Sequence, residues 1–342
     1  MQHHREISNR VAQERSVRRS VLHWYNHNAR RFFWREQHGS NSVPPLDPYI
    51  VLVSEVMLQQ TQTSRVQEKL PQFLAQFPSL TTLAAADNAT IIKAWAGMGY
   101  NSRALRLRDC AKAVVERFGG EIPSSVDVLL TLPGIGSYTA SAVAAFAFHQ
   151  DVAVLDVNIR RVYSRLFEAM PTTVSLAEEG TIQAIAERIY PRGEASRWHQ
   201  AVMDIGALFC TARAPKCSHC PLKTTCASAG AMQEARKTKR PEPSWNGTPN
   251  RIWRGRIVEI LRGLETDDRI SLLELHRKLF IQHTTTESLF QTNNITHSET
   301  AWLLALVQGL EREGIAEIYE EKGTNKASLR DFSHYSLRLY KG

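Results

Sequence analysis

The chain has 342 residues, of which 43% are hydrophobic, and its formal net charge is +8. This length allows one large or two ordinary domains, each able to bury its own core. The amino terminus is polar and basic, and no long apolar run follows, so we expect neither a secretory signal nor a membrane span and place the protein in the cytosol. The excess of Lys and Arg favours a polyanionic partner, either nucleic acid or an anionic membrane surface.

The first predicted segment, residues 1–14, is a disordered terminus. From residue 15 to residue 229 the sequence predicts a succession of helices with short connections and almost no strand-like alternation, which indicates an all-α domain. An extended loop is expected over residues 36–48. Further turn signals separate the helices at residues 77–80, 97–102, 118–125 and 132–136.

One carboxylate falls among apolar residues in "YIVLVSEVMLQQTQTSRV", residues 49–66. On a helix, Glu55 lies one turn from Val51 and Leu52, on the face that their spacing predicts to be buried. A buried carboxyl group tends to have a raised pKa and to hold a proton that it can donate. The alternative is a Glu on the helix flank, paired with Arg65 or another base, and this stretch alone favours that alternative.

The stretch "SSVDVLLTLPGIGSYTASAVAAFAF", residues 124–148, predicts a helix, a tight turn and a second helix. Leu132 packs, while Gly134 and Gly136 allow a turn whose backbone N–H groups and following helix start face one way. Such a turn can hold an anion, and "LPGIG" matches the helix-hairpin-helix motif, which binds a DNA phosphate without reading sequence. A plain helix–helix corner is the alternative.

A second carboxylate, Asp156, precedes a predicted helix in "VAVLDVNIRRVYSRLF". A capping Asp keeps a low pKa, so it stays an anion that can face a developing cation. Asn158, on the first turn, can orient a water or a carboxylate, or can simply face solvent. A protonated Glu55 and an ionised Asp156 together follow the logic of glycosidic-bond cleavage through an oxocarbenium-like transition state.

Four of the five cysteines lie close together near the end of the all-α segment, at Cys210, Cys217, Cys220 and Cys226. In a reducing compartment, clustered thiols indicate a metal centre that holds zinc or an iron–sulfur cluster. Cys110 stands alone and is expected to be a small core residue.

Residues 230–250 are polar, basic and rich in Pro and Gly, which is the composition of a linker and marks a domain boundary. Beyond it, residues 251–342 contain three helical stretches followed by two strand-like ones, "IAEIYEEKG" and "HYSLRLY". This order predicts a small α+β winged-helix-like domain. Such a module either contacts DNA or serves as a structural unit.

These motifs resemble the helix-hairpin-helix DNA glycosylases with a carboxyl-terminal iron–sulfur cluster, and most closely the MutY-type adenine DNA glycosylases. "SEVMLQQTQ", "GMGY", "LPGIGSYTASAV", "LDVNIRRV", "MDIGALFC" and "CSHCPL" occur in the family's order within residues 15–229. The resemblance implies an all-α helix-hairpin-helix glycosylase domain. The spacing C-x6-C-x2-C-x5-C is the family's, so the resemblance also implies a [4Fe-4S] cluster on the loop 210–226 rather than zinc.

The resemblance implies an enzyme of base excision repair that flips adenine out of double-stranded DNA, from a mispair with 8-oxoguanine or G, and hydrolyses its N-glycosidic bond. Glu55 falls on the family's acid, which protonates adenine at N7, and Asp156 on the aspartate that stabilises the sugar cation. Tyr138 and Asn158 fall on positions that support these groups. Residues 124–148 contain no Lys to form a Schiff base, which favours a monofunctional glycosylase over a lyase.

The DNA-binding positions also follow from the resemblance. Gln59, Gln60 and Tyr100 match the residues that wedge into the duplex. Trp34 and Arg35 correspond to positions near the adenine pocket. The hairpin positions are Leu132, Gly134 and Gly136. Basic residues around the cysteines, Arg213, Lys216 and Lys223, are expected to face DNA phosphates. A monomer without a membrane partner, bacterial, cytoplasmic and nucleoid-associated, is expected.

The chain departs from the family pattern at several points. Val157 replaces the usual Gly after the catalytic Asp, and Asn101 stands where a second Tyr is common. The winged-helix-like tail resembles actinobacterial members and replaces the usual Nudix-like domain, although Phe332, Ser333 and His334 resemble that domain's 8-oxoguanine-reading loop. Two alternatives stay open: a glycosylase of the same superfamily acting on T or U opposite G, and a non-catalytic iron–sulfur DNA-binding protein.

Overall fold

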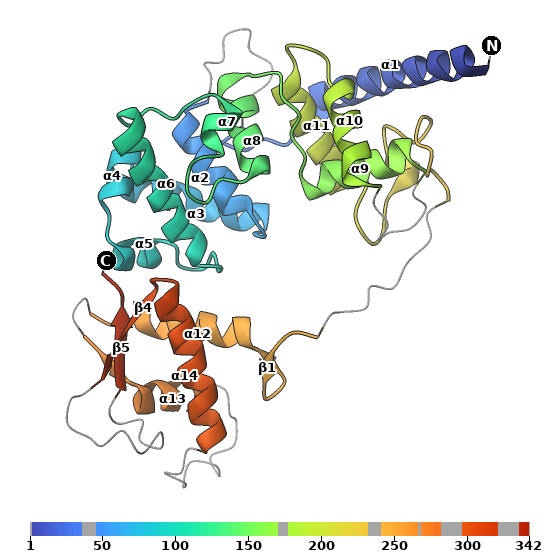
Figure 1. Cartoon of the computed structure of the whole chain (residues 1–342). Helices are drawn as coiled ribbons and strands as arrows, with labels where there is room; N and C mark the ends of the chain where they lie inside the picture. Colours follow the sequence, from blue (N-terminus) through green and yellow to red (C-terminus); the bar gives the residue numbers. More distant parts are fainter. Residues whose placement is uncertain are drawn as a thin grey trace. The chain divides into compact units, whose positions relative to one another are not determined.

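The protein is described here from a computed structural model, which covers residues 2–35, 46–169, 177–231, 241–265, 268–281, 296–320 and 335–341 (Figure 1). The chain forms two compact units. The first unit combines Met1–Val56 with Glu121–Lys239, and the second combines Met57–Gly120 with Arg240–Gly342. The segment predicted as one domain, residues 15–229, is therefore divided, and its residues 57–120 belong with the carboxyl-terminal part.

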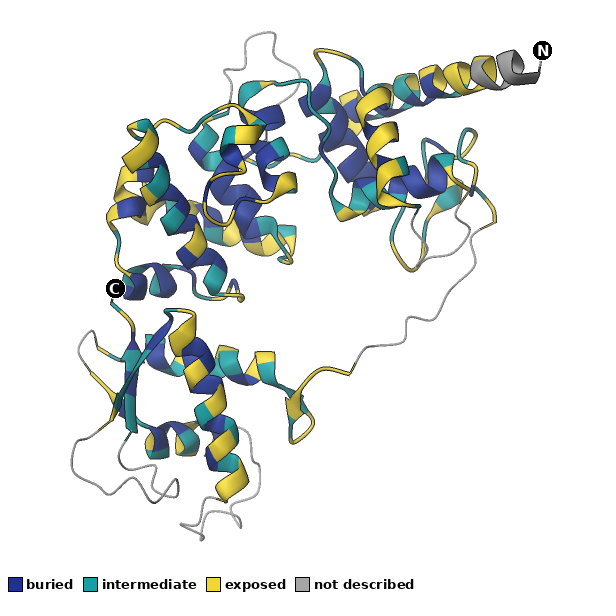
Figure 2. Ribbon diagram, viewed as in Figure 1, coloured by how far each residue is buried: buried dark blue, intermediate teal, exposed yellow. Residues whose placement is uncertain are grey.

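Helices make up the first unit. In chain order they are α1 (Gln2–Asn28), α2 (Pro48–Leu58, whose last two residues belong to the second unit), α7 (Val126–Leu129), α8 (Ser137–Phe148), α9 (Val157–Phe167), α10 (Glu179–Ile189), α11 (Ala195–Leu208) and the 3-10 turn Cys217–His219. Figure 2 shows buried residues along the inward faces of these helices. Helix α1, for example, buries Val17, Val21 and Tyr25, which recur every four residues.

The prediction that residues 1–14 are disordered is wrong, because α1 begins at Gln2. No Gly or Pro interrupts the segment, so nothing local stops the helix. Tertiary contacts also hold it: the buried Glu14 carboxylate accepts a hydrogen bond from Arg188 Nε at 2.6 Å. Beside it, Gln13 Nε2 donates to the Thr225 carbonyl at 3.0 Å.

The second unit begins with the helices α3 (Thr63–Gln76), α4 (Leu80–Ala85), α5 (Asn88–Ala94) and α6 (Ser102–Phe118). Its carboxyl-terminal part contains β1 (Ser244–Trp245), β2 (Thr248–Pro249), α12 (Asn250–Arg262), β3 (Ile270–Ser271), α13 (Leu272–Ile281), α14 (His297–Arg312), β4 (Ala316–Glu320) and β5 (Tyr335–Leu339). None of the helices in the described ranges is long and apolar enough to cross a membrane.

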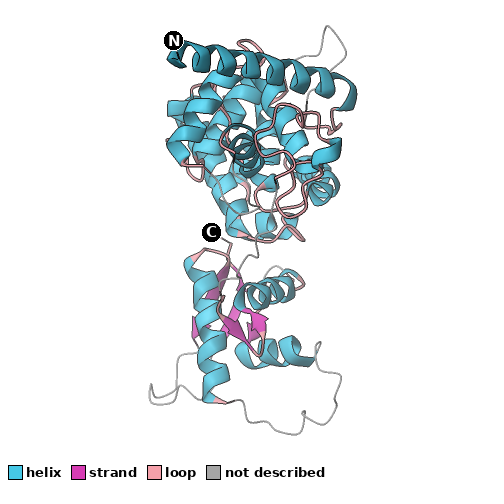
Figure 3. Cartoon of the chain, turned by 90° about the vertical axis from the view of Figure 1, so that its right-hand side faces the viewer, coloured by secondary structure: helices cyan, strands magenta, loops and turns pink. Residues whose placement is uncertain are grey.

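A three-stranded antiparallel sheet in the order β3-β5-β4 replaces the predicted two-stranded hairpin (Figure 3). Leu337 of the central strand pairs with Ile270 on one side and with Ile318 on the other. Strand β3 has only two residues, too few to show the alternation by which a strand is recognised in sequence. The loop that contains Phe332, Ser333 and His334 lies outside the described residues.

The second half of the predicted linker is folded. Strands β1 and β2 form a hairpin whose two turn residues are Asn246 and Gly247, both with positive φ. An Asn-Gly pair in this conformation is the preferred two-residue hairpin turn. The indole of Trp245 stacks on that of Trp302 in α14 at 5.1 Å, so the hairpin packs against the carboxyl-terminal helices.

Helices α9 and α11 pack closely because α11 has a glycine at the contact. A Cβ atom on Gly206 would lie 2.8 Å from the Asn158 Cβ and 3.4 Å from the Asn158 Cα. Backbone on the α9 side cannot yield as a flexible side chain can, so a side chain at position 206 forces the helices apart.

We therefore expect Gly206→Ala to lower the thermal midpoint of unfolding, because it displaces the first turn of α9. The expected loss of stability is about 1–3 kcal/mol. Gly180→Ala in α10 is the matched control, because a Cβ atom added there would meet no neighbouring group within 4 Å. The control should leave stability unchanged or raise it, and equal effects of the two substitutions on unfolding would contradict this account.

Candidate active site

The Glu55 carboxyl group is buried in the first unit. Its side chain comes from α2 and is 6% exposed, and its Oε2 accepts a hydrogen bond from the Tyr138 hydroxyl at 2.5 Å. Burial raises the pKa of Glu55 to about 7, although the Tyr138 hydrogen bond and the charge of Arg35 act in the opposite direction. The pairing with Arg65 is wrong, because Arg65 binds the Glu68 carboxylate at 2.9 Å.

Tyr138 reaches Glu55 from the first turn of α8, directly after the glycine-containing turn. Burial, reinforced by the charges of Glu55 and Asp156, raises the pKa of Tyr138 well above its ordinary value. The phenol therefore keeps its proton across the physiological range and acts as a hydrogen-bond donor to the carboxyl group.

Asp156 caps α9, as the sequence predicted. Its Oδ1 accepts from the Ile159 backbone N–H at 2.6 Å, and its Oδ2 accepts from the Asn158 side-chain amide at 2.7 Å. The prediction of a low pKa is wrong in direction: burial raises the pKa of Asp156, and the hydrogen bonds from Ile159 and Asn158 only partly offset it. The solvent-facing alternative for Asn158 is also wrong.

A short chain of hydrogen bonds links Asp156 to the first cysteine. Arg161 donates from NH2 to the Asn158 Oδ1 at 2.7 Å and to the Gly206 carbonyl at 2.9 Å. Its Nε donates to the Cys210 carbonyl at 2.6 Å. The position of Cys210 is thus coupled through Arg161 and Asn158 to the carboxylate of Asp156.

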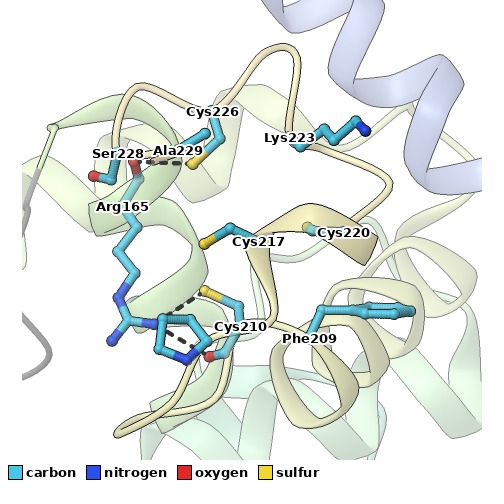
Figure 4. A pocket seen from close by; sticks show the side chains of 10 residues that line it. Arg165, Phe209, Cys210, Cys217, Cys220, Lys223, Cys226, Ser228 and Ala229 are labelled. Atoms are coloured by element: carbon cyan, nitrogen blue, oxygen red, sulfur yellow. Dashed lines mark hydrogen bonds between the residues drawn. The ribbon is translucent and has the colours of Figure 1, made fainter. Parts of the chain in front are cut away.

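The four clustered cysteines line one cavity in the loop that follows α11 (Figure 4). Arg165 borders this cavity and donates from NH1 to the Cys210 Sγ at 3.3 Å, while the Cys226 thiol donates to the Arg165 carbonyl at 3.4 Å. Burial raises the pKa of Cys220 to about 11 and also raises the pKa of Cys226, so these two bare thiols disfavour the thiolate form. A bound cationic centre would reverse that preference.

Within the described residues, no three His, Cys, Asp or Glu side chains come close enough together to hold one metal ion. Cys110 is a buried core residue, as predicted.

Trp34 and Arg35 belong to the first unit, with Trp34 buried and stacked on Phe32 at 4.8 Å. Arg35 NH1 donates to the Asp204 Oδ1 at 2.8 Å, and Arg30 Nε donates to the same oxygen at 2.7 Å. Sequence reasoning missed Asp204, a fully buried carboxylate that orients Arg35. Its signal was a lone charge in the apolar stretch "VMDIGAL" of α11.

The hairpin has the predicted helix, turn and helix. Leu132 is buried and its carbonyl accepts from the Ile135 N–H at 3.3 Å, while Gly134 has a φ of 74° that favours glycine. Gly136 is the N-cap of α8, and no side chain caps that helix. The first N–H groups of α8 are thus not occupied by a side-chain cap, as an anion site requires.

Gln59, Gln60 and Tyr100 lie on two loops of the second unit. Gln60 and Tyr100 both have positive φ values, 55° and 44°, which are strained for residues other than glycine. The buried Arg103 clamps these loops together. Its guanidinium donates to the carbonyls of Met57, Gln59, Met98 and Gly99 and to the Thr61 hydroxyl.

Arg103 is the second residue that sequence reasoning missed. Its only sequence signal is an Arg in the first turn of a helix, directly after the turn "GMGYNS", where a basic residue opposes the helix dipole. The structure shows that tertiary contacts determine the residue at this position.

Proteins of known function match this chain in sequence. The profile of the HhH-GPD superfamily base excision DNA repair proteins matches residues 53–189. The adenine DNA glycosylase of Mycolicibacterium smegmatis is 36% identical over 246 residues, which are 72% of this chain and 80% of that protein. The chain belongs to the adenine DNA glycosylases of this superfamily. It is therefore a DNA N-glycosylase of base excision repair, and the non-catalytic alternative is wrong.

Further relatives agree with this assignment. The human adenine DNA glycosylase is 35% identical over 227 residues, which are 66% of this chain but 41% of that protein. Among solved structures, a thermostable thymine-DNA glycosylase has a TM-score of 0.57 at 27% identity and covers 64% of this chain and 97% of its own. A non-covalent endonuclease III–DNA complex, with a TM-score of 0.53 at 20% identity, covers 63% of this chain and 96% of its own and shares the fold.

We expect Glu55→Gln to stabilise the protein in a pH-dependent way. Because burial raises the pKa of Glu55 from 4.5 to about 7, ionising Glu55 destabilises the folded state. This penalty is absent below pH 4.5 and complete above about pH 7, where it is worth roughly 3 kcal/mol. The variant should match the wild type at acidic pH and unfold at higher denaturant concentration at alkaline pH.

Glu68→Gln is the control, because Glu68 is an exposed carboxylate paired with Arg65. Its free energy of unfolding is measured over the same pH range, so that the effect of removing an exposed carboxylate is separated from the effect of removing the buried one. A pH-independent difference between Glu55→Gln and the wild type would contradict the raised pKa.

Proposed function

We propose that the enzyme removes adenine mispaired with 8-oxoguanine or G in double-stranded DNA, by monofunctional hydrolysis with Glu55 as general acid. The observation that carries this proposal is the buried Glu55 carboxyl group, whose pKa burial raises to about 7. A general acid works best when its pKa lies near the working pH, because it is then protonated often enough and still gives up its proton readily.

The proton of Glu55 goes to N7 of the flipped adenine, which makes the base a better leaving group. The Tyr138 hydroxyl, 2.5 Å from Oε2, holds the carboxyl group in place and stabilises the carboxylate that remains after transfer. Arg35 adds positive charge near the same group, and Asp204 orients Arg35 in turn.

Asp156 stabilises the cation that forms on the sugar as the base departs. Both of its oxygens already accept hydrogen bonds, from Ile159 and Asn158, so the carboxylate cannot turn away from its position. Its partial burial strengthens its attraction for a developing positive charge, because little water screens it there.

Several features support a monofunctional mechanism on mispaired DNA. Residues 124–148 contain no Lys, and the position of the lyase amine is held by Tyr138, whose raised pKa keeps it a neutral phenol. The helix-hairpin-helix turn, with Leu132, Gly134 and Gly136, binds a phosphate. Gln59, Gln60 and Tyr100 enter the duplex, and Trp34 and Arg35 border the adenine pocket.

A [4Fe-4S] cluster bound by Cys210, Cys217, Cys220 and Cys226 completes the first unit in this proposal. Its four cationic irons would compensate the thiolates and fix the loop that carries the exposed residues Arg213, Lys216 and Lys223. These side chains then present positive charge to DNA phosphates.

The carboxyl-terminal part is proposed to be a winged-helix-like domain. The order α12, β3, α13, α14, β4 and β5, with β5 between the other two strands, supports this assignment.

We expect a single-turnover assay on duplexes with adenine opposite 8-oxoguanine to give strand breaks only after alkali. Glu55→Gln should abolish adenine release, and the wild-type rate should fall by about tenfold per pH unit well above pH 7, as the acid loses its proton. Duplexes with A opposite G and with T opposite G, assayed in the same way, show from which mispair the base is released. Breaks without alkali, or release of thymine in preference to adenine, would contradict the proposal.

We expect the purified protein to contain about four irons and four inorganic sulfides per chain. Cys220→Ala should lose them and weaken DNA binding, whereas the buried Cys110→Ala is the control and should keep the full complement. One zinc and no iron in a protein purified without oxygen would contradict the cluster.

A further inference from the structure

The carboxyl-terminal part of the second unit packs on helices α5 and α6 of the same unit. Asn88, at the start of α5, donates from Nδ2 to the Gly314 carbonyl at 2.7 Å, and its backbone N–H donates to the Lys341 carbonyl at 3.1 Å. Asn88 is buried in this contact. The two parts of the second unit thus share directional hydrogen bonds.

Arg262 extends this contact to the loop that carries Tyr100. It is the last residue of α12, its side chain is 10% exposed, and its Nε donates to the Ile92 carbonyl at 3.0 Å. Its NH2 donates to the Asn101 Oδ1 at 2.8 Å. The guanidinium therefore joins α12 to the end of α5 and to the residue after Tyr100.

The Asn101 side chain does not cap its own helix. Asn101 is the N-cap of α6, a position where an Asn side chain normally accepts a hydrogen bond from its own helix, yet its side chain makes no such bond. Its backbone is in the right-handed helical region, at φ −58° and ψ −26°, rather than in the extended region of a capping residue. The bond from Arg262 takes the oxygen that capping would use.

The preceding loop has a left-handed backbone at three residues, and it is strained at Tyr100. Gly97, Gly99 and Tyr100 have φ values of 80°, 66° and 44°, and Tyr100 is 53% exposed. A non-glycine residue with positive φ persists only where its surroundings fix it. The Arg103 clamp fixes this loop from one side, and the Arg262–Asn101 bond fixes it at the residue that follows.

We propose that Arg262 is a positioning residue, through which the carboxyl-terminal domain sets the conformation of the Tyr100 loop for entry into DNA. This inference rests on the proposed role of Tyr100 as a wedge. Without the bond between Arg262 and Asn101, the residue after Tyr100 is no longer held from the carboxyl-terminal side, so the strained backbone at Tyr100 relaxes and the side chain leaves its present direction.

The test is a double-mutant cycle on the full-length protein with Arg262→Ala, Asn101→Ala and the two together. The probe is a duplex with an uncleavable fluorinated adenosine opposite 8-oxoguanine, and the readouts are its dissociation constant and the salt dependence of binding. We expect each single variant to weaken binding about tenfold and the double variant to be no weaker than either.

The salt dependence separates positioning from phosphate contact. Because the Arg262 side chain is 10% exposed and already has protein partners, its loss should leave the slope of log Kd against log salt unchanged. Arg251→Ala is the matched control, since Arg251 lies on the same helix but is 59% exposed and pairs with Glu242. It should leave the binding of the probe unchanged within about twofold.

Additive losses in the cycle, or a shallower salt slope for Arg262→Ala, would overturn the inference and make Arg262 a phosphate contact. Thermal unfolding of each variant identifies any loss of fold. Asn101→Ala, which removes a single side-chain amide, tests the bond if Arg262→Ala unfolds. Tyr100→Ala separates a failure of the proposed wedge role from a failure of the role proposed for Arg262. If it binds normally, the wedge role in the proposed function fails; if it alone binds weakly, only the role of Arg262 fails.

Discussion

A carboxyl group that is removed from water holds its proton more tightly, and this constraint organises the first unit. Glu55 lies on the buried face of α2, and Tyr138 and Arg35 limit the rise of its pKa to about 7. Stronger compensation would ionise Glu55 and leave no acid, whereas none would hold the proton too tightly for transfer. The hairpin brings Tyr138 to this place, and α11 supplies the Asp204 carboxylate that orients Arg35.

The second carboxylate depends on a different support. Asp156 is held by its own helix and by Asn158, and Asn158 is held by Arg161, which also binds the Cys210 carbonyl. Gly206 lets α9 and α11 approach closely enough for these bonds to form. The cysteine loop is therefore connected, through Arg161 and Asn158, to the carboxylate that is proposed to stabilise the sugar cation.

The sequence alone could predict those features that depend on residues close together in the chain. The helices, the Gly134 turn, the Asp156 cap and the cysteine spacing each follow from a few neighbouring residues. The division into two units did not, because it depends on long-range packing that returns the carboxyl-terminal residues to α5 and α6. Arg103, Asp204 and Arg262 were missed for the same reason: each acts on carbonyls or side chains far away in sequence, so nothing near it indicates its role.

Two pKa-related predictions from the sequence had different outcomes. The spacing of apolar residues allowed a buried Glu55, although that stretch alone favoured a Glu on the helix flank paired with a base, and the structure shows Glu55 to be buried. The low pKa predicted for Asp156 neglected desolvation, which exceeds the effect of its capping hydrogen bonds. Spacing along a helix reveals which face is buried, whereas the depth of burial at a helix start depends on elements that pack there from elsewhere in the chain.

The most direct test of the central claim is the titration of Glu55 itself. Infrared difference spectra between the wild type and Glu55→Gln isolate the carboxyl C=O band of this one residue as the pH is raised. A band that disappears with a midpoint near pH 7 is the result expected from the buried, Tyr138-bonded carboxyl group. A midpoint near 4.5, the ordinary value for Glu, would show that Glu55 is ionised at neutral pH and would contradict its proposed role as the acid.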